Sequence, residues 1–281
     1  MPEPESNGIL ARFVAIGLNS GVVRVFAAIT LLSSLAVLLL LPGLTGPVMV
    51  VFIPTAAAVL LIRVGVGRGQ VSNLLFTHRA WRVSLKWAVI SLGLALILRL
   101  GVGILGSVVI FDYEFRPGAL TPLLLGIFVF AAGEEIGWRG FALPALLARG
   151  YRPLTATLLL GVPWALLHLP LAGAGMLNEG WSMWALFVFM MAISVLVSWV
   201  YLASGLSITS AVLFHGGQNV LAVLNDGIDP LKGGWVMVGV YGLAATLVVI
   251  ATKGRLGMPP EEHRVPNPGA SPISLTEREE A

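Results

Sequence analysis

The sequence contains no cysteine, and only 11% of its 281 residues are charged. Without cysteine, the chain cannot form disulfides, use a thiol nucleophile or bind metal through thiolates. The scarcity of charge is unusual, because soluble domains carry about 25% charged residues. Hydrophobic residues make up 57% of the chain and are spread over most of its length, which is more than one soluble core could bury. The composition therefore predicts a polytopic membrane protein.

Nucleic acid is not an expected partner, although the formal net charge is +3. The basic residues lie in the loops between apolar runs, which is the pattern of a membrane protein. The lipid bilayer is therefore the first expected partner.

A membrane-spanning helix needs about 20 mostly apolar residues. The sequence predicts an all-α bundle of eight such helices within a membrane domain at 22–252. A short N-terminal segment, 1–21, precedes it, and a tail rich in proline and charge, 253–281, is expected to be disordered. The predicted spans are 22–41, 47–64, 84–110, 121–148, 154–173, 181–203, 206–224 and 234–252. The fifth contains Pro163 and Pro170 and is expected to be interrupted.

The distribution of lysine and arginine predicts the orientation. Thirteen of the 17 basic residues lie before span one or at its start, between spans two and three or at their adjoining ends, between spans four and five, or after span eight. Only Arg116 and Lys232 lie on the opposite side, and Arg99 and Arg139 lie within spans. Because positive charge marks the cytoplasmic side, both termini are expected in the cytoplasm.

Two of the 14 acidic residues, Glu134 and Glu135, lie within a predicted span. An ionised side chain at the bilayer centre costs roughly 2.5–3.5 kcal/mol, so such groups pair, line a wet cavity or do chemistry. Glu135 and Arg139 are four residues apart and are predicted to form an ion pair. Glu134 lies about 100° around the helix, is left without this arginine and is the better candidate for chemistry.

The glycines around these charges, Gly133, Gly137 and Gly140, are expected to thin one side of the helix. Small residues there allow a neighbouring helix to approach closely.

Two histidines lie in other spans. Trp164 precedes His168 by four residues, and His215 precedes Asn219 by four, so each pair shares a helix face. Either histidine could be a packing residue, and Gln218 is expected to point elsewhere and to bond between helices. Counting about 1.5 Å per residue along each helix places Glu134, His168 and His215 at similar depth, near the midplane.

These groups are the parts of a hydrolase that attacks a carbonyl without a covalent nucleophile. A carboxylate and an imidazole can deprotonate water, while an imidazole and an amide can stabilise an oxyanion. Two histidines and one carboxylate also resemble a zinc site, and sequence spacing leaves both interpretations open.

The sequence "EEIGWR" (Glu134 to Arg139) fits EExxxR, and "HGGQN" (His215 to Asn219) fits HxxxN. With Trp164-xxx-His168 between them, residues of about 121–224 resemble the CAAX-protease and bacteriocin-processing (CPBP) family of intramembrane glutamic proteases. The resemblance implies an eight-helix bundle that needs no metal or cofactor. Glu134 would be the general base with His168, His215 and Asn219 would form the oxyanion hole, and Glu135 and Arg139 would support them. Trp164 stands where the family commonly has phenylalanine.

On this interpretation the second partner is a membrane-associated protein or peptide substrate; prenylation is not carried over. Two alternatives stay open: a proton-coupled transporter using the same carboxylate and histidines as a relay, and a non-catalytic scaffold or immunity protein. Arg99 is expected either to neutralise a glutamate or to bind a substrate carboxylate.

Overall fold

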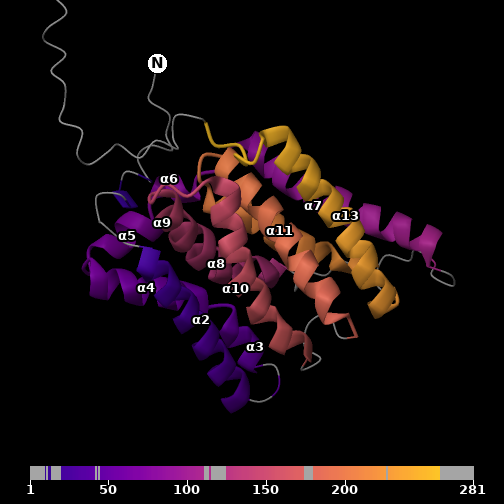
Figure 1. Cartoon of the computed structure of the whole chain (residues 1–281), viewed down its shortest axis with the longest axis horizontal. Coiled ribbons are helices and arrows are strands. Elements are labelled where there is room, and N and C mark those ends of the chain that lie inside the picture. Colours follow the sequence, from indigo (N-terminus) through magenta and orange to yellow (C-terminus); the bar gives the residue numbers. More distant parts are fainter. Residues whose placement is uncertain are drawn as a thin grey trace, which may run out of the picture.

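The computed structural model describes residues 10, 12–13, 20–41, 43, 45–110, 114, 125–173, 180–225 and 227–259. Within these residues the chain is all-helical and has no strand (Figure 1). The helices are α2 (Ser20–Leu40), α3 (Thr45–Val50), α4 (Ile53–Gly65), α5 (Gln70–Leu75), α6 (His78–Trp81), α7 (Leu85–Val109), α8 (Gly126–Gly137), the π-helix η2 (Trp138–Ala142), α9 (Leu143–Leu147), α10 (Pro153–Gly173), α11 (Met183–Ala203), α12 (Ile208–Val220), the 3₁₀-helix η3 (Leu221–Asn225) and α13 (Pro230–Thr252). The predicted fold class is confirmed.

Six stretches of the described chain are long and apolar enough to cross a membrane: Gly21–Leu40, Thr45–Gly65, Leu85–Val109, Pro153–Ala172, Met183–Ala203 and Pro230–Thr252. They correspond to predicted spans one, two, three, five, six and eight. The other two predicted spans consist of shorter helices. Span four is divided into α8, η2 and α9, and span seven is α12 followed by η3. The count of eight is therefore not confirmed.

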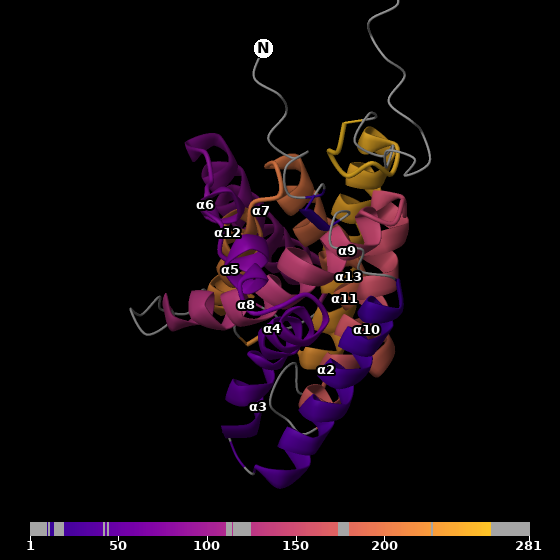
Figure 2. The ribbon, with the colours of Figure 1, turned by 90° about the vertical axis from the view of Figure 1, so that its left-hand side faces the viewer.

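The α8 helix differs from the long helices in direction. In Figure 2 it runs crosswise to α2 and α10. Its first residue is Gly126. Residue 121, where predicted span four begins, lies outside the described residues. A fixed rise per residue along the membrane normal therefore does not apply to α8.

The α10 helix runs without a break through Pro163 and Pro170. The predicted interruption is wrong. A proline removes one backbone hydrogen bond, but in a membrane bundle the neighbouring helices can satisfy the freed carbonyl. The helix also carries Trp164 and His168, so its continuity keeps both side chains on one face.

The α11 helix forms the centre of the bundle, because 78% of its apolar membrane-length stretch is buried. The corresponding share is 22–33% for α2, α7, α13 and the α3–α4 stretch. It packs against α10, α12 and α13. The outer helices present large apolar side chains outward, among them Leu39, Ile97 and Ile250. Such a surface suits a lipid environment.

The crossing of α4 and α8 depends on two glycines. A Cβ atom added to Gly137 would lie 2.4 Å from the backbone carbon of Pro54, and one added to Gly133 would lie 2.9 Å from the carbonyl oxygen of Val51. The Thr55 hydroxyl donates a hydrogen bond to the Gly133 carbonyl (2.6 Å). The expected close approach is confirmed for these two positions. Gly140 faces a different helix, through Ile208.

Two of the segments that carry predicted cytoplasmic arginines and lysines, before α10 and after α13, meet at one end of the bundle. The Leu154 amide at the start of α10 donates to the Gly254 carbonyl just after α13 (3.2 Å). A Cβ atom at Gly257 would lie 2.4 Å from the Cβ atom of Ala203, the last residue of α11. This arrangement agrees with the predicted topology, and the side of the membrane stays a prediction.

The chain before α2 also contributes to the core. The Phe13 side chain is buried and packs on Phe141, with 6.3 Å between ring centroids. The expected disorder of the tail concerns 253–281, of which residues 253–259 are described and the rest lie outside the described residues.

Candidate active site

The two neighbouring glutamates of α8 are both buried but have different partners. The Glu135 Oε1 atom lies 3.2 Å from Arg139 Nη1, which confirms the ion pair expected from the i, i+4 spacing. The same oxygen accepts a hydrogen bond from His215 Nδ1 on α12 (2.7 Å). Glu135 Oε2 is buried and has no hydrogen-bond partner in the described structure. The contact with His215 was not expected, because it joins two helices.

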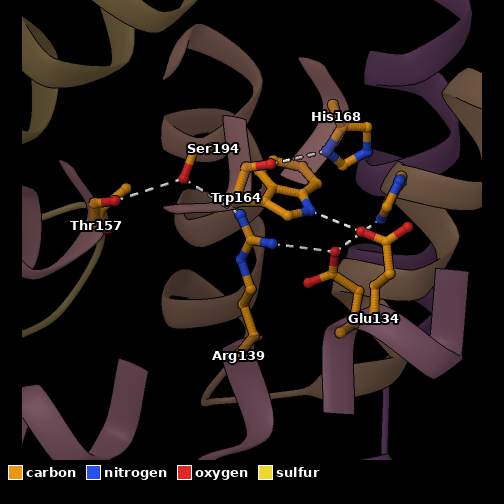
Figure 3. A network of polar contacts seen from close by, with 8 residues as sticks. Glu134, Arg139, Thr157, Trp164, His168 and Ser194 are labelled. Carbon is orange, nitrogen blue, oxygen red and sulfur yellow. Dashed lines mark hydrogen bonds and ion pairs between the residues drawn. The ribbon is translucent and has the colours of Figure 1, made fainter. Parts of the chain in front are cut away.

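Arg139 lies in the π-helix that follows α8. Its guanidinium group lies over the Trp164 ring, 4.3 Å from the ring centroid, and Nη2 donates to Ser194 Oγ on α11 (3.3 Å). Figure 3 shows the Arg139 side chain between Ser194 and Glu134. The ion pair is thus held by a cation–π contact and a second helix as well.

Glu134 has a neutral partner. Trp164 Nε1 donates a hydrogen bond to Glu134 Oε2 (2.6 Å), as Figure 3 shows. The sequence suggested only that the Trp164 ring stacks against His168. The ring does lie edge-on to His168, and likewise to His215, with 5.5 Å between centroids in each pair. A phenylalanine at this position would keep the ring contacts but could not donate to the carboxylate.

The hydrogen bonds of the two histidines determine which ring nitrogens carry protons. His168 Nδ1 lies 2.8 Å from the Trp164 carbonyl oxygen, which can only accept, so Nδ1 carries the proton. In neutral His168 the Nε2 atom is then free to accept a proton. His215 Nδ1 donates to the Glu135 carboxylate, which leaves Nε2 as its second functional atom.

The four predicted catalytic residues, Glu134, His168, His215 and Asn219, line one cavity of about 310 Å³. They come from three helices, α8, α10 and α12, and apolar side chains from α8, α11 and α13 form much of the remaining wall. The depth expected for Glu134, His168 and His215, near the membrane midplane, stays a prediction, but all three side chains line this one cavity.

Arg99 and Gln218 line the same cavity. The interhelical bonding expected for Gln218 is confirmed, since its Oε1 atom accepts from Arg99 Nη2 (2.7 Å), but the expectation that it points elsewhere is wrong. Arg99 does not neutralise a glutamate among the described residues, because the groups it contacts, on Gln218, Asn225 and Met237, are neutral.

Within the described residues, no group of three or more histidine, aspartate or glutamate side chains is arranged to hold a metal ion. The cavity instead presents an amide, Asn219, beside His215. An amide is a poor ligand for zinc and a good hydrogen-bond donor.

The segment of the sequence that carries these residues is similar to known proteins. Residues 116–221 match the family model described as Type II CAAX prenyl endopeptidase Rce1-like. The family resemblance inferred from the motifs is confirmed. A CAAX prenyl protease 2 of Methanococcus maripaludis is 30% identical over an alignment of 117 residues that covers 38% of this chain. The chain spans 43% of the length of that relative. The Rce1-like segment contains all four predicted catalytic residues, whereas Arg99 lies outside it.

Proposed function

We propose that this protein is an intramembrane endopeptidase that hydrolyses a peptide bond of a membrane-associated protein or peptide with an activated water. The main support is the shared cavity, which Glu134, His168, His215 and Asn219 all line. The match of residues 116–221 to CAAX prenyl endopeptidases supports the same reaction class.

The different partners of the two glutamates suggest different roles. Glu135 contacts Arg139 and His215, so its negative charge is paired with groups of the protein itself. Glu134 receives one neutral hydrogen bond, from Trp164 to Oε2, and lines the cavity. In our proposal its second oxygen takes a proton from water, assisted by the Nε2 atom of His168. The water oxygen bonds to the carbonyl carbon and gives a tetrahedral oxyanion, and the proton then passes to the leaving amine as the C–N bond breaks and the carbonyl re-forms as a carboxyl group.

His215 and Asn219, which line the same cavity, suit the negative charge that develops on the carbonyl oxygen. With Glu134 and Glu135 ionised and Arg139 charged, the buried cluster has one excess negative charge, which an imidazolium at His215 balances. In that form His215 Nε2 donates a hydrogen bond while Nδ1 remains bound to Glu135. Together with Asn219 it would supply two donors to the oxyanion.

The decisive experiment compares wild-type protein with Glu134→Gln, reconstituted in liposomes with membrane-anchored peptides. Glutamine keeps the size of the side chain and cannot act as the base, so cleavage should disappear while thermal stability in detergent is retained. Glu261→Gln, the same substitution far from the motifs in the sequence, is the matched control. Near-normal cleavage by folded Glu134→Gln would overturn the glutamic mechanism.

The same assay with different peptides tests which class of substrate the protein cleaves. The relative from Methanococcus maripaludis is named a CAAX prenyl protease, so peptides should be offered with and without a prenylated C-terminal cysteine. Cleavage of neither kind by wild-type protein would favour a scaffold, and proton-driven solute uptake by the same liposomes would favour a transporter.

A further inference from the structure

Arg99 on α7 lines the cavity and carries a positive charge, and the proposed mechanism gives it no role. Its side chain is 5% exposed, and its hydrogen bonds go to neutral acceptors. Nε donates to the Gln218 carbonyl oxygen and Nη2 to Gln218 Oε1, both at 2.7 Å. Burying a charge is costly, so an arginine kept here without a carboxylate among the described residues calls for a function.

The arginine fixes the orientation of the Gln218 amide. A guanidinium group only donates hydrogen bonds, so the atom facing Arg99 must be the amide oxygen of Gln218. The Tyr241 hydroxyl donates to the same oxygen (3.4 Å). The nitrogen of the Gln218 amide must then point the other way.

That nitrogen, Gln218 Nε2, donates a hydrogen bond to Asn219 Oδ1. The oxygen of the Asn219 amide is thereby occupied, and its Nδ2–H₂ group is left to donate to an oxygen in the cavity that Asn219 lines. In the opposite orientation, Asn219 would present an oxygen to the developing oxyanion and repel it. Arg99, which is two hydrogen bonds away, therefore determines which orientation the Asn219 amide adopts.

We propose that Arg99 and Gln218 are positioning residues, which hold the Asn219 amide with its N–H₂ group toward the oxyanion. The positive charge of Arg99 also polarises the chain of hydrogen bonds, because each bond strengthens the donor of the next. This inference rests on the proposed peptidase function and adds two residues to it, one of them outside the Rce1-like segment.

The sharpest test is Gln218→Glu. The substitution keeps the shape and strengthens the contact with Arg99, but it offers Asn219 an acceptor in place of a donor. The Asn219 amide should then turn its nitrogen toward the new carboxylate and its oxygen toward the cavity. We expect kcat to fall about 10²–10³-fold, the loss typical of one missing oxyanion donor. KM should change little and thermal stability should be kept.

Four further variants exclude a merely structural role. In an Asn219→Ala background, Gln218→Glu should cause no further loss of kcat, because it acts through Asn219. Arg99→Met should lower kcat, and Arg99→Lys, which keeps a cation and a donor, should lose less. Ser210→Ala removes a buried contact with Ser91 (2.8 Å) between the same two helices and should leave kcat unchanged.

The outcomes separate the two proposals. Normal kcat in folded Gln218→Glu, or simple multiplication of its effect with that of Asn219→Ala, overturns the positioning role. A raised KM with normal kcat in Arg99→Met would assign Arg99 to substrate binding and also overturn it. If wild-type protein does not cleave, or Glu134→Gln does, the peptidase proposal itself fails and the positioning role fails with it.

Discussion

Glu134 and Glu135 are adjacent in the sequence. Successive residues of an α-helix are rotated by about 100° around its axis, so the two side chains have different surroundings. Glu135 faces Arg139 and His215, whereas Glu134 faces Trp164 and the cavity. The same type of side chain is therefore held in place at one position and left available at the next. This division follows from the geometry of α8 together with contacts from α10 and α12.

The Glu135–Arg139 pair leads to a prediction for stability. Glu135→Ala and Arg139→Ala should each destabilise the protein by roughly 3–5 kcal/mol, because the remaining charge is buried without its partner. The double variant should recover part of that loss in detergent melting experiments. It should not recover cleavage, since His215 still lacks the carboxylate that it contacts. Losses of stability that simply add would show that the two charges do not interact.

Metal dependence provides another test. The hydrogen bond from His215 Nδ1 to Glu135 does not show whether the site binds zinc, because zinc-bound histidines also donate to carboxylates. The amide of Asn219 in the cavity is the feature that favours a metal-free oxyanion hole. EDTA or phenanthroline should therefore leave cleavage by the purified protein unchanged. Stoichiometric zinc, with activity lost on chelation and restored by zinc, would contradict this prediction.

At the residue scale, sequence spacing predicts contacts within one helix and gives little about contacts between helices. The Glu135–Arg139 pair and the shared face of Trp164 and His168 follow from i, i+4 geometry. The bonds from His215 to Glu135 and from Trp164 to Glu134 join residues 80 and 30 positions apart. Their partners depend on how the helices cross, which no spacing within a single helix encodes.

At the scale of elements, the crossing of α4 and α8 sets the position of the glutamates. Gly137→Ala should be strongly destabilising, by about 1–3 kcal/mol or more, because the new methyl group would meet the backbone of Pro54 rather than a movable side chain. Thermal melting measures the loss. Gly93→Ala on α7 is the matched control, since a Cβ atom there has no neighbour within 4 Å.

If Gly137→Ala and Gly93→Ala melt at the same temperature, the close approach of the two helices does not contribute to stability. Cleavage should also fall in Gly137→Ala, because moving α8 away from α4 moves Glu134 relative to His168.

The lengths of hydrophobic runs predicted the long helices but not the short ones. Run length indicates how much chain is apolar, and six runs do match described helices that are long and apolar enough to cross a membrane. It does not indicate direction, so the crosswise α8 and the π-helix after it could not be predicted. Pro163 and Pro170 suggested a break that neighbouring helices prevent.

For the whole molecule, the orientation is the main open prediction. Both termini should be cytoplasmic, because thirteen lysines and arginines lie on that side and two on the other. Reporter fusions after residue 253 should be active only in a cytoplasmic assay. Activity confined to the outside would reverse the topology and place the end of the bundle formed by Leu154, Gly254 and Ala203 there.

The π-helix at Trp138–Ala142 makes the position of the glutamates depend on the type of helix that these residues form. A π-turn holds one more residue than an α-turn, so it takes up one extra residue between α8 and α9 within a single turn. If the same residues formed a regular α-helix, that residue would rotate the glutamates by about 100° relative to α9. Glu134 would then leave the cavity without any substitution in the site. In this stretch the conformation of the backbone is as much a part of the active site as the identity of the residues.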